Sequence, residues 1–336
     1  MEKLKYTRVE ECCEILDSMR IPITASDRKE GKYPYYGANG IQDYVNDYIF
    51  DDELVLLAED GGNFGSKEKP IAYRVSGKCW VNNHAHVLKP KEEIDVDYLC
   101  YSLMFYKVDG MINGATRKKL TQTAMKKMKI PLRNIVEQKK IVQQLNKIIE
   151  IREKAKKELN LLDNLIQARF VEMFGDPITN SKLLPIEKIE ERYFLKAGIT
   201  TKAEDIHDYL KDKYEIPCYG GNGIRGYVEN LSYEGCYPII GRQGALCGNV
   251  QYATGKFHAT EHAVLVSTLK NDNTMWVYYM LKLMDLYRYH TGAAQPGLAV
   301  KKLNTIDVIV ADINLQNQFA AFVHQINKSQ LIFHIF

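Results

Sequence analysis

The chain has 336 residues, 46% hydrophobic and 26% charged, a balance typical of globular proteins and enough for two or three domains. Its net charge of +3 does not by itself indicate a nucleic-acid-binding protein, and no apolar run approaches the roughly 18 residues of a membrane span. Seven cysteines without a C-x-x-C pair, and a charged start without an apolar signal segment, favour a reducing cytoplasmic location.

The first part of the chain, residues 1–132, is expected to form a domain rich in β-strands. Residues 32–45 place a Gly-Ala-Asn-Gly turn between β-prone aromatic and branched residues, which predicts a hairpin. Residues 53–58 are an expected buried strand that runs into a Gly-rich loop, and residues 78–88 are a second strand region. Residues 96–106 are expected to be helical.

A single long helix is expected over residues 133–175. Residues 134–174 contain no Gly and no Pro, and Gly175 and Pro177 then provide a stop signal. About 40 residues at 1.5 Å each make a rod of roughly 60 Å, which requires a partner helix. Its apolar residues recur at gaps of three and four along one seam: Ile141, Leu145, Ile148, Ala155, Leu159, Leu162, Ile166, Phe170 and Met173.

After this helix the first part of the chain is repeated. Residues 215–228 match the hairpin segment at an offset of 183, and Gly77, His84, Leu120 and Gln138 have identical counterparts at an offset of 178. Agreement in both order and spacing predicts a tandem duplication, with a second domain over residues 176–311 and a second helix over residues 312–336.

The two helices have unsatisfied apolar faces, so we expect them to pair. No long return loop is present, and the second helix should therefore run antiparallel to the first. The predicted fold is α+β, with two pseudo-symmetric mixed α/β domains separated by an antiparallel two-helix coiled coil.

A search for catalytic and metal-binding motifs gives little. There is no P-loop, no dinucleotide-binding glycine pattern and no G-x-S-x-G. His84 and His86 alternate on an expected strand, so both cannot easily reach one metal ion, and neither they nor His258 and His262 have a clear set of further ligands. We therefore expect no catalytic residue and no metal site.

Local charge and loop composition point to DNA binding. Residues 1–116 carry 14 basic and 20 acidic side chains, whereas residues 117–158 carry 14 basic and 4 acidic ones. Such a basic strip can contact phosphates, although an ordinary solvated helix face is an equally good interpretation, and Arg and Gln in Gly-rich loops can read base edges. The candidate DNA-binding residues are Tyr36, Asn39, Gln42, Asn63, Lys67, Arg117, Lys118, Lys119, Tyr219, Asn222, Arg225, Arg242, Gln243, Lys301 and Lys302.

The candidates do not all carry the same weight. Asn39 and Asn222 are common to both copies and are more readily explained as turn formers. Positions that differ between the copies, such as Gln42 against Arg225, are better candidates for sequence specificity.

Three features together resemble the specificity subunit of type I restriction–modification systems: the Y-G-x-N-G-I-x-x-Y-V segment, the Gly-rich loop after a buried strand, and the I-P-L…E-Q-K-K-I-V entry into a long helix. The resemblance covers nearly the whole chain. It implies two target-recognition domains that each read one half of an asymmetric, split site in double-stranded DNA, and a coiled coil that sets their spacing. It also implies two DNA-methyltransferase subunits and restriction/motor subunits as partners, with S-adenosylmethionine, ATP and magnesium bound only by those partners.

One departure from the family and two alternatives accompany this interpretation. The second helix has about 20 residues where the first has about 40, either naturally or through truncation. A methyltransferase or nuclease with unrecognised catalytic residues, and a non-catalytic scaffold or sugar-binding protein, are the competing hypotheses.

Overall fold

A computed structural model describes residues 4–333 except 115–116, 212 and 293–295. The chain forms two compact units, Met1–Glu153 and Lys154–Phe336, which we call the first and second domains. The division falls inside one continuous helix, α4 (Ile135–Phe174), so each domain contains about half of that helix. Within the described residues, no helix is both long and apolar enough to cross a bilayer.

The first domain is built on a curled six-stranded sheet with the strand order β2-β7-β5-β6-β3-β4. Neighbouring strands are antiparallel except for β3 and β6, which run parallel. The predicted hairpin is present, because β3 and β4 are joined through a tight turn at Ala38–Asn39 in which Gly40 has a φ of +111°. The strands are β2 (Cys13–Ile15), β3 (Glu30–Gly37), β4 (Gly40–Val45), β5 (Phe50–Ala58), β6 (Ala72–Val81) and β7 (Ala85–Pro90).

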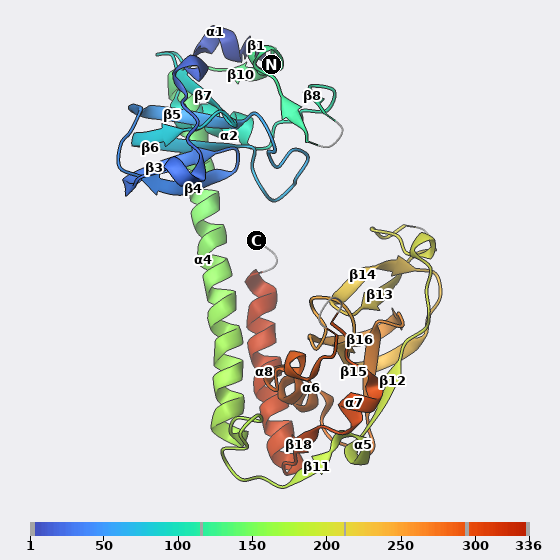
Figure 1. The fold of residues 1–336 in the computed structure, drawn as a ribbon. Helices are drawn as coiled ribbons and strands as arrows, with labels where there is room; N and C mark the ends of the chain where they lie inside the picture. Colours follow the sequence, from blue (N-terminus) through green and yellow to red (C-terminus); the bar gives the residue numbers. More distant parts are fainter. Residues whose placement is uncertain (1–3, 115–116, 212, 293–295, 334–336) are drawn as a thin grey trace. The chain divides into compact units, whose positions relative to one another are not determined.

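Helix α2 (Val96–Met104) packs against strands β5, β6 and β7 (Figure 1). Asp95 caps its first turn by accepting hydrogen bonds from the backbone N–H groups of Asp97 and Tyr98. The remaining elements are β1 (Lys5–Arg8), α1 (Val9–Cys12), the 3₁₀ turns η1 (Asp17–Met19) and η2 (Ala25–Asp27), β8 (Ile112–Asn113), β9 (Lys119–Leu120), α3 (Gln122–Lys126) and β10 (Lys129–Leu132).

The second domain repeats this topology strand for strand. Its sheet has the order β12-β17-β15-β16-β13-β14, again with one parallel pair, β13 and β16. Helix α6 (Thr274–Leu283) packs against β15 and β16, and Asn273 caps it as Asp95 caps α2. The strands are β12 (Tyr193–Ala197), β13 (Ile216–Gly220), β14 (Gly223–Val228), β15 (Tyr233–Gly241), β16 (Val250–Ala259) and β17 (Ala263–Thr268).

The shorter elements of the second domain also have counterparts in the first. Strands β11 and β18 form a two-stranded pair, as β1 and β10 do. The predicted duplication and mixed α/β fold class are therefore confirmed. These elements are β11 (Ile186–Lys188), α5 (Ile189–Arg192), η3 (Ala203–Asp205), η4 (Leu286–Tyr289), α7 (Val300–Asn304), β18 (Asp307–Ile309) and α8 (Ile313–Phe333).

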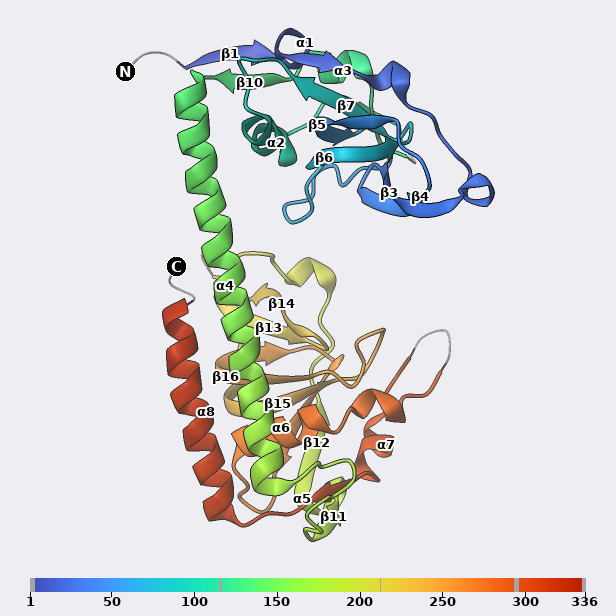
Figure 2. The same ribbon diagram turned by 90° about the vertical axis from the view of Figure 1, so that its left-hand side faces the viewer.

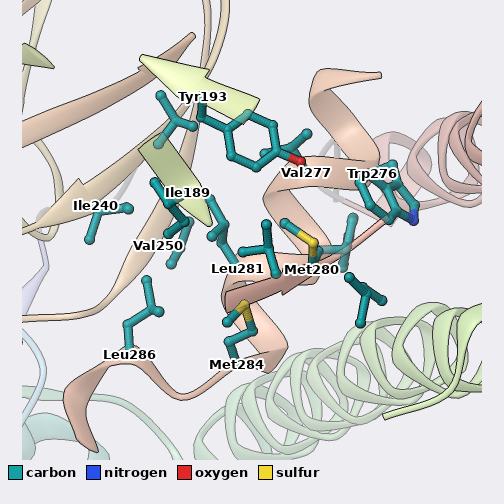
Figure 3. Close-up of a cluster of buried hydrophobic side chains, with 14 of the residues drawn as sticks. Ile189, Tyr193, Ile240, Val250, Trp276, Val277, Met280, Leu281, Met284 and Leu286 are labelled. Atoms are coloured by element: carbon teal, nitrogen blue, oxygen red, sulfur yellow. The ribbon is translucent and has the colours of Figure 1, made fainter. Parts of the chain in front are cut away.

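The main core of the second domain lies between its sheet and α6. Trp276, Met280 and Leu281 of α6 are fully buried: Leu281 lies on the side of Ile189 and Val250, whereas Trp276 points the other way and contacts Phe170 and Phe174 of α4 (Figure 3). The same cluster extends to the end of α4 and to α8, so these helices belong to the core of this domain. The first domain has an equivalent core on the α2 side of its sheet.

Helix α4 begins and ends where its sequence predicts. The side chain of Asn134 accepts a hydrogen bond from the backbone N–H of Glu137, and Gly175 ends the helix with a φ of +81°. The predicted seam is only partly buried: Ile166 and Phe170 are fully buried, whereas Ile148 is 61% exposed. Phe174 is buried and Met173 only half-buried, so the seam ends one residue later than predicted.

Helix α8 lies beside the second half of α4 and runs antiparallel to it, as predicted (Figures 1 and 2). Phe319 of α8 contacts both Phe170 and Phe174, with ring centroids 5.3 and 5.9 Å apart. Further along α8, Phe322 lies under Arg169 of α4, which fixes the opposite direction of the two helices. The helices have 21 and 40 residues, so the predicted difference in length is present.

A buried glutamine fastens the start of each long helix to its own domain. In the first domain, Gln138 accepts a hydrogen bond from the backbone N–H of Asp95 and donates to the carbonyls of Glu93 and Arg133. In the second, Gln316 accepts from the N–H of Asn273 and donates to the carbonyl of Ala311 and to Asp272. These contacts explain why a glutamine recurs at both positions.

Candidate nucleic-acid interface

Three loops of the second domain meet around one hollow. They are the β13–β14 turn at Gly221–Asn222, residues 242–249 after β15, and the turn at 260–262 between β16 and β17. A Cβ atom on Gly241 would lie 2.1 Å from the carbonyl oxygen of Gly221, so the close approach of these two loops requires glycine. The backbone N–H of Arg242 donates to the carbonyl of His262 over 3.0 Å and joins the second and third loops.

The hollow between these loops has a volume of about 560 Å³. It gathers three predicted DNA-binding residues, Asn222, Arg225 and Gln243, whose side chains are exposed at its rim. Two residues that were not predicted, Thr260 and His262, also line it. The structure therefore brings three of the predicted residues together, and the prediction named only part of the lining.

Several polar groups at this hollow lack partners among the described residues. The Thr260 hydroxyl, Nδ1 of His262 and Nε of Arg242 are buried and make no hydrogen bond there. Thr260 is fully buried, so its hydroxyl is also shielded from bulk water. A buried polar group without a partner costs about 1–3 kcal/mol, which makes this cluster unusual for the interior of a domain.

The equivalent loops of the first domain are satisfied internally. Asn82, the counterpart of Thr260, donates from Nδ2 to Oε1 of Gln42, the counterpart of Arg225, over 3.0 Å. Asn39 donates from Nδ2 to the carbonyl of Gly61 over 3.0 Å, which supports its interpretation as a turn former. In the second domain, Asn222 instead accepts a 2.6 Å hydrogen bond from Asn249.

The charge of the second loop is reversed between the domains. Glu59 and Asp60 correspond to Arg242 and Gln243, because the carbonyls of Glu59 and Arg242 accept from the equivalent N–H groups of Leu120 and Leu298. The basic strip neutralises these two acidic residues. Arg117 lies 2.7 Å from Asp60, and Lys119 lies 3.1 Å from Glu59, as measured between the nearest nitrogen and oxygen atoms.

Glu59 also belongs to a buried ionic network. Nδ1 of His86 lies 2.7 Å from Asp17, and Arg20 contacts both Glu59, at 2.7 Å, and Asp17, at 3.5 Å. Burial alone would raise the pKa of Asp17, but hydrogen bonds from His86, the Val87 N–H and Gln122 outweigh burial and lower it. The pKa of Glu59 is lowered in the same way, against the effect of burial, by Arg20, His86 and Lys119.

This network bears on the expectation about metal ligands. Potential ligand atoms of Asp17, Glu59 and His86 lie within 4.8 Å of one another, a grouping that the sequence did not suggest. Arg20 already bonds to both carboxylates, so their charge is compensated and we assign the cluster to structural ion pairing. The placement of His84 on a strand was wrong: it lies in the turn before β7, and only His86 is on the strand.

The other predicted residues occupy varied environments. Tyr36 and Tyr219 are half-buried, burial raises the pKa of each phenol, and their rings contact Tyr73 and Phe257, respectively. Asn63 donates to the carbonyl of Pro70, and the exposed Lys67 and Lys118 line a separate hollow of the first domain. Lys301 and Lys302 are exposed on α7. This helix is the counterpart of α3, not of residues 117–119. Lys302 lines a different hollow from the one that Arg225 lines.

The internal repeat carried a signal for the residues that sequence reasoning missed. His262 is identical to His84, whereas Thr260 replaces Asn82 at the same offset of 178. A comparison limited to positions that differ between the copies would have included Thr260 among many others and would have omitted His262.

Comparison with known proteins gives consistent matches. The family described as type I restriction modification DNA specificity domain matches residues 1–161 and 194–334. The type I restriction enzyme EcoprrI specificity subunit of Escherichia coli is 47% identical over 129 residues, which are 38% of this chain and 32% of that protein. A putative type I restriction enzyme specificity subunit of Haemophilus influenzae is 35% identical over 144 residues, 43% of this chain and 37% of that protein.

These alignments span only about a third of the length of the curated relatives. Solved structures agree in fold over a longer range. The S subunit of a type I restriction–modification system from M. genitalium has a TM-score of 0.63 at 15% identity, with 99% of this chain and 92% of that chain covered. A chain from a structure of type I restriction–modification complex assembly has a TM-score of 0.51 at 14% identity, with 99% and 93% covered.

Proposed function

The chain belongs to the type I restriction modification DNA specificity domain family, and we propose that it is a specificity subunit whose two domains each read one half of a split site in double-stranded DNA. The observation that carries this proposal is the duplicated match, because one family description fits both halves of the chain. The domains share a topology but differ in charge at equivalent loop positions, which suits an asymmetric site.

The proposed DNA contacts are of two kinds. Three exposed residues contact base edges, since their side chains carry the donors or acceptors that base readout needs: Gln42 on β4, Arg225 on β14 and Gln243 in the loop after β15. Exposed lysines such as Lys67, Lys118 and Lys301 contact phosphates and hold the domains on the duplex without reading sequence. Arg117 and Lys119 would first have to leave Asp60 and Glu59, so they contribute less.

The chain itself carries no catalytic residue in this proposal. Two methyltransferase subunits and restriction/motor subunits provide the chemistry, and S-adenosylmethionine, ATP and magnesium are bound there. The exposed apolar residues Ile148, Ile149 and Ile151 of α4 support the presence of protein partners, since the part of the chain that the structure describes leaves them exposed. All seven cysteines are free, which fits a reducing cytoplasm.

Selection from a random duplex library tests the proposal. The full chain, alone and together with its methyltransferase subunits, should enrich a motif of two short defined segments separated by an undefined spacer. Binding should fall steeply with salt, as phosphate contacts require. Enrichment of no sequence, or of one continuous motif, would contradict the proposal, and methyl transfer by the chain alone would favour the methyltransferase alternative.

A further inference from the structure

The hollow of the second domain presents hydrogen-bond donors that no described residue satisfies. Arginine only donates, and neither Arg225 at the rim nor Arg242 in the loop behind it has a hydrogen bond or ion pair from its side chain to a described residue. The Thr260 hydroxyl and Nδ1 of His262 are buried without partners in the same lining. A ligand that supplies acceptors would pair with the two arginines and with the Thr260 hydroxyl and so remove the cost of leaving them unpaired.

The surroundings favour a base over a phosphate. The carboxylate of Glu261 lies 3.2 Å from Nε2 of His262, so a negative charge beside the hollow partly offsets the charge of the two arginines. Ile224 and Leu246 line the hollow and are 55% and 53% exposed, which provides apolar walls suited to a flat ring. In DNA the base that offers two acceptors together is guanine, through O6 and N7 in the major groove.

We propose that this hollow binds the O6/N7 edge of a guanine in the half-site read by the second domain. Arg225 donates to the base edge, and the unpaired Thr260 hydroxyl in the lining of the hollow offers a second donor. The inference rests on the proposed function and adds to it the kind of base, the domain that reads it and the residues responsible.

The first domain cannot read a base in this way through its equivalent loops. Gln42 and Asn82 already bond to each other across the equivalent space, and Glu59 and Asp60 stand where Arg242 and Gln243 do in the second domain. Guanine recognition by this mechanism is therefore confined to one half of the split site.

The experiment uses the full chain and the duplex selected by the wild-type protein. Each guanine of that duplex is replaced in turn by 7-deazaguanine, which lacks N7 but still pairs with cytosine. At one guanine of one half-site, the replacement should weaken wild-type binding roughly five- to hundredfold. Arg225→Met should weaken binding to the unmodified duplex by a similar factor and show no further loss with 7-deazaguanine at that position.

Matched variants separate recognition from folding. Thr260→Val keeps the shape of the side chain and removes only the hydroxyl, so it should leave folding intact and reduce the same guanine preference. Gln42→Met is the equivalent change in the first domain. Whatever its effect on overall binding, it should leave unchanged the factor by which 7-deazaguanine weakens binding at the guanine read by Arg225. Arg225 is exposed, so its replacement should not disturb folding, and a thermal melt checks this.

Three results would overturn the inference. The first is a guanine preference that survives both Arg225→Met and Thr260→Val. The second is that Arg225→Met weakens binding to all duplexes equally, which would identify Arg225 as a phosphate contact. The third is that Arg225→Met loses the preference for a base other than guanine. A wild-type chain that selects no split site overturns the proposed function and this inference with it, whereas the three results above leave the proposed function standing.

Discussion

The two domains share one backbone plan but use their polar side chains differently. In the first, the loops at the candidate interface bond to one another: Asn82 to Gln42, and Arg117 to Asp60. In the second, the equivalent loops leave the Thr260 hydroxyl and Nδ1 of His262 without described partners. Both copies thus keep the same framework but differ in their loops. We call the arrangement of the first domain closed, because its polar groups bond to one another, and that of the second domain open, because some of its polar groups do not.

Each domain also contains one buried ionic network that the other lacks. Asp17, Glu59 and His86 form the network of the first domain, where the second has Ala197, Arg242 and Val264 at the equivalent positions. In the second domain Arg192 forms a two-pronged pair with Asp272, at 2.5 and 2.7 Å. The buried ion pairs described here therefore differ between the two domains, although the topology of the domains is the same.

Removing either buried network gives the largest expected effect. Asp17→Ala should destabilise the first domain by about 3–5 kcal/mol, because it removes the carboxylate that bonds to the buried His86 and one of the two carboxylates that Arg20 contacts. Asp272→Ala should do the same to the second domain through Arg192. Hydrogen exchange measured segment by segment checks this: β7 should lose protection in the first variant and β17 in the second, and loss of protection in both domains in either variant would contradict the independence of the networks.

The glutamines that fasten the helices should give effects of equal size in the two copies. Gln138→Leu and Gln316→Leu each leave backbone groups unpaired, and each should cost about 1–3 kcal/mol for the groups that stay buried. Urea unfolding of both variants provides the measurement. A large cost in only one of them would show that the repeated residue serves different purposes in the two domains.

Acid should weaken the first domain through its own network. The pKa values of Asp17 and Glu59 are lowered on folding, so their stabilisation is complete above about pH 5 and is lost as the pH falls below about 4, through their folded-state values. Thermal unfolding between pH 7 and pH 3 should show the wild type losing stability faster than Asp17→Asn. Parallel curves for the two proteins would argue against this contribution.

Transplanting the closed arrangement should give the smallest change. Arg225→Gln combined with Thr260→Asn places the amide pair of the first domain in the hollow of the second. We expect a gain of about 0.5–1.5 kcal/mol from the new hydrogen bond, measured by thermal unfolding. The matched single variant Thr260→Asn lacks the partner and should not show this gain, and equal stability of the two variants would mean that the loops do not adopt the closed arrangement.

The sequence by itself determined the features that depend on local rules. The duplication follows from two constant offsets, and the hairpin turns follow from Gly40 and Gly223, whose φ angles of +111° and +99° favour glycine. The long helix follows from a run without Gly or Pro that ends at Gly175. The turns and the helix depend on neighbours within a few residues, and the duplication is a comparison of one part of the sequence with another, so none of these predictions needed the tertiary structure.

Only the tertiary structure decided which polar groups are paired. Gln122 bonds to Asp17 across 105 positions, and Arg20 bonds to Glu59 across 39. The same holds for the helix seam, where Phe174 is buried by Phe319 of α8 while Ile148 of the same helix is exposed. Pairing and burial depend on which segments meet in space, and a pattern of spacing along the chain does not contain that information.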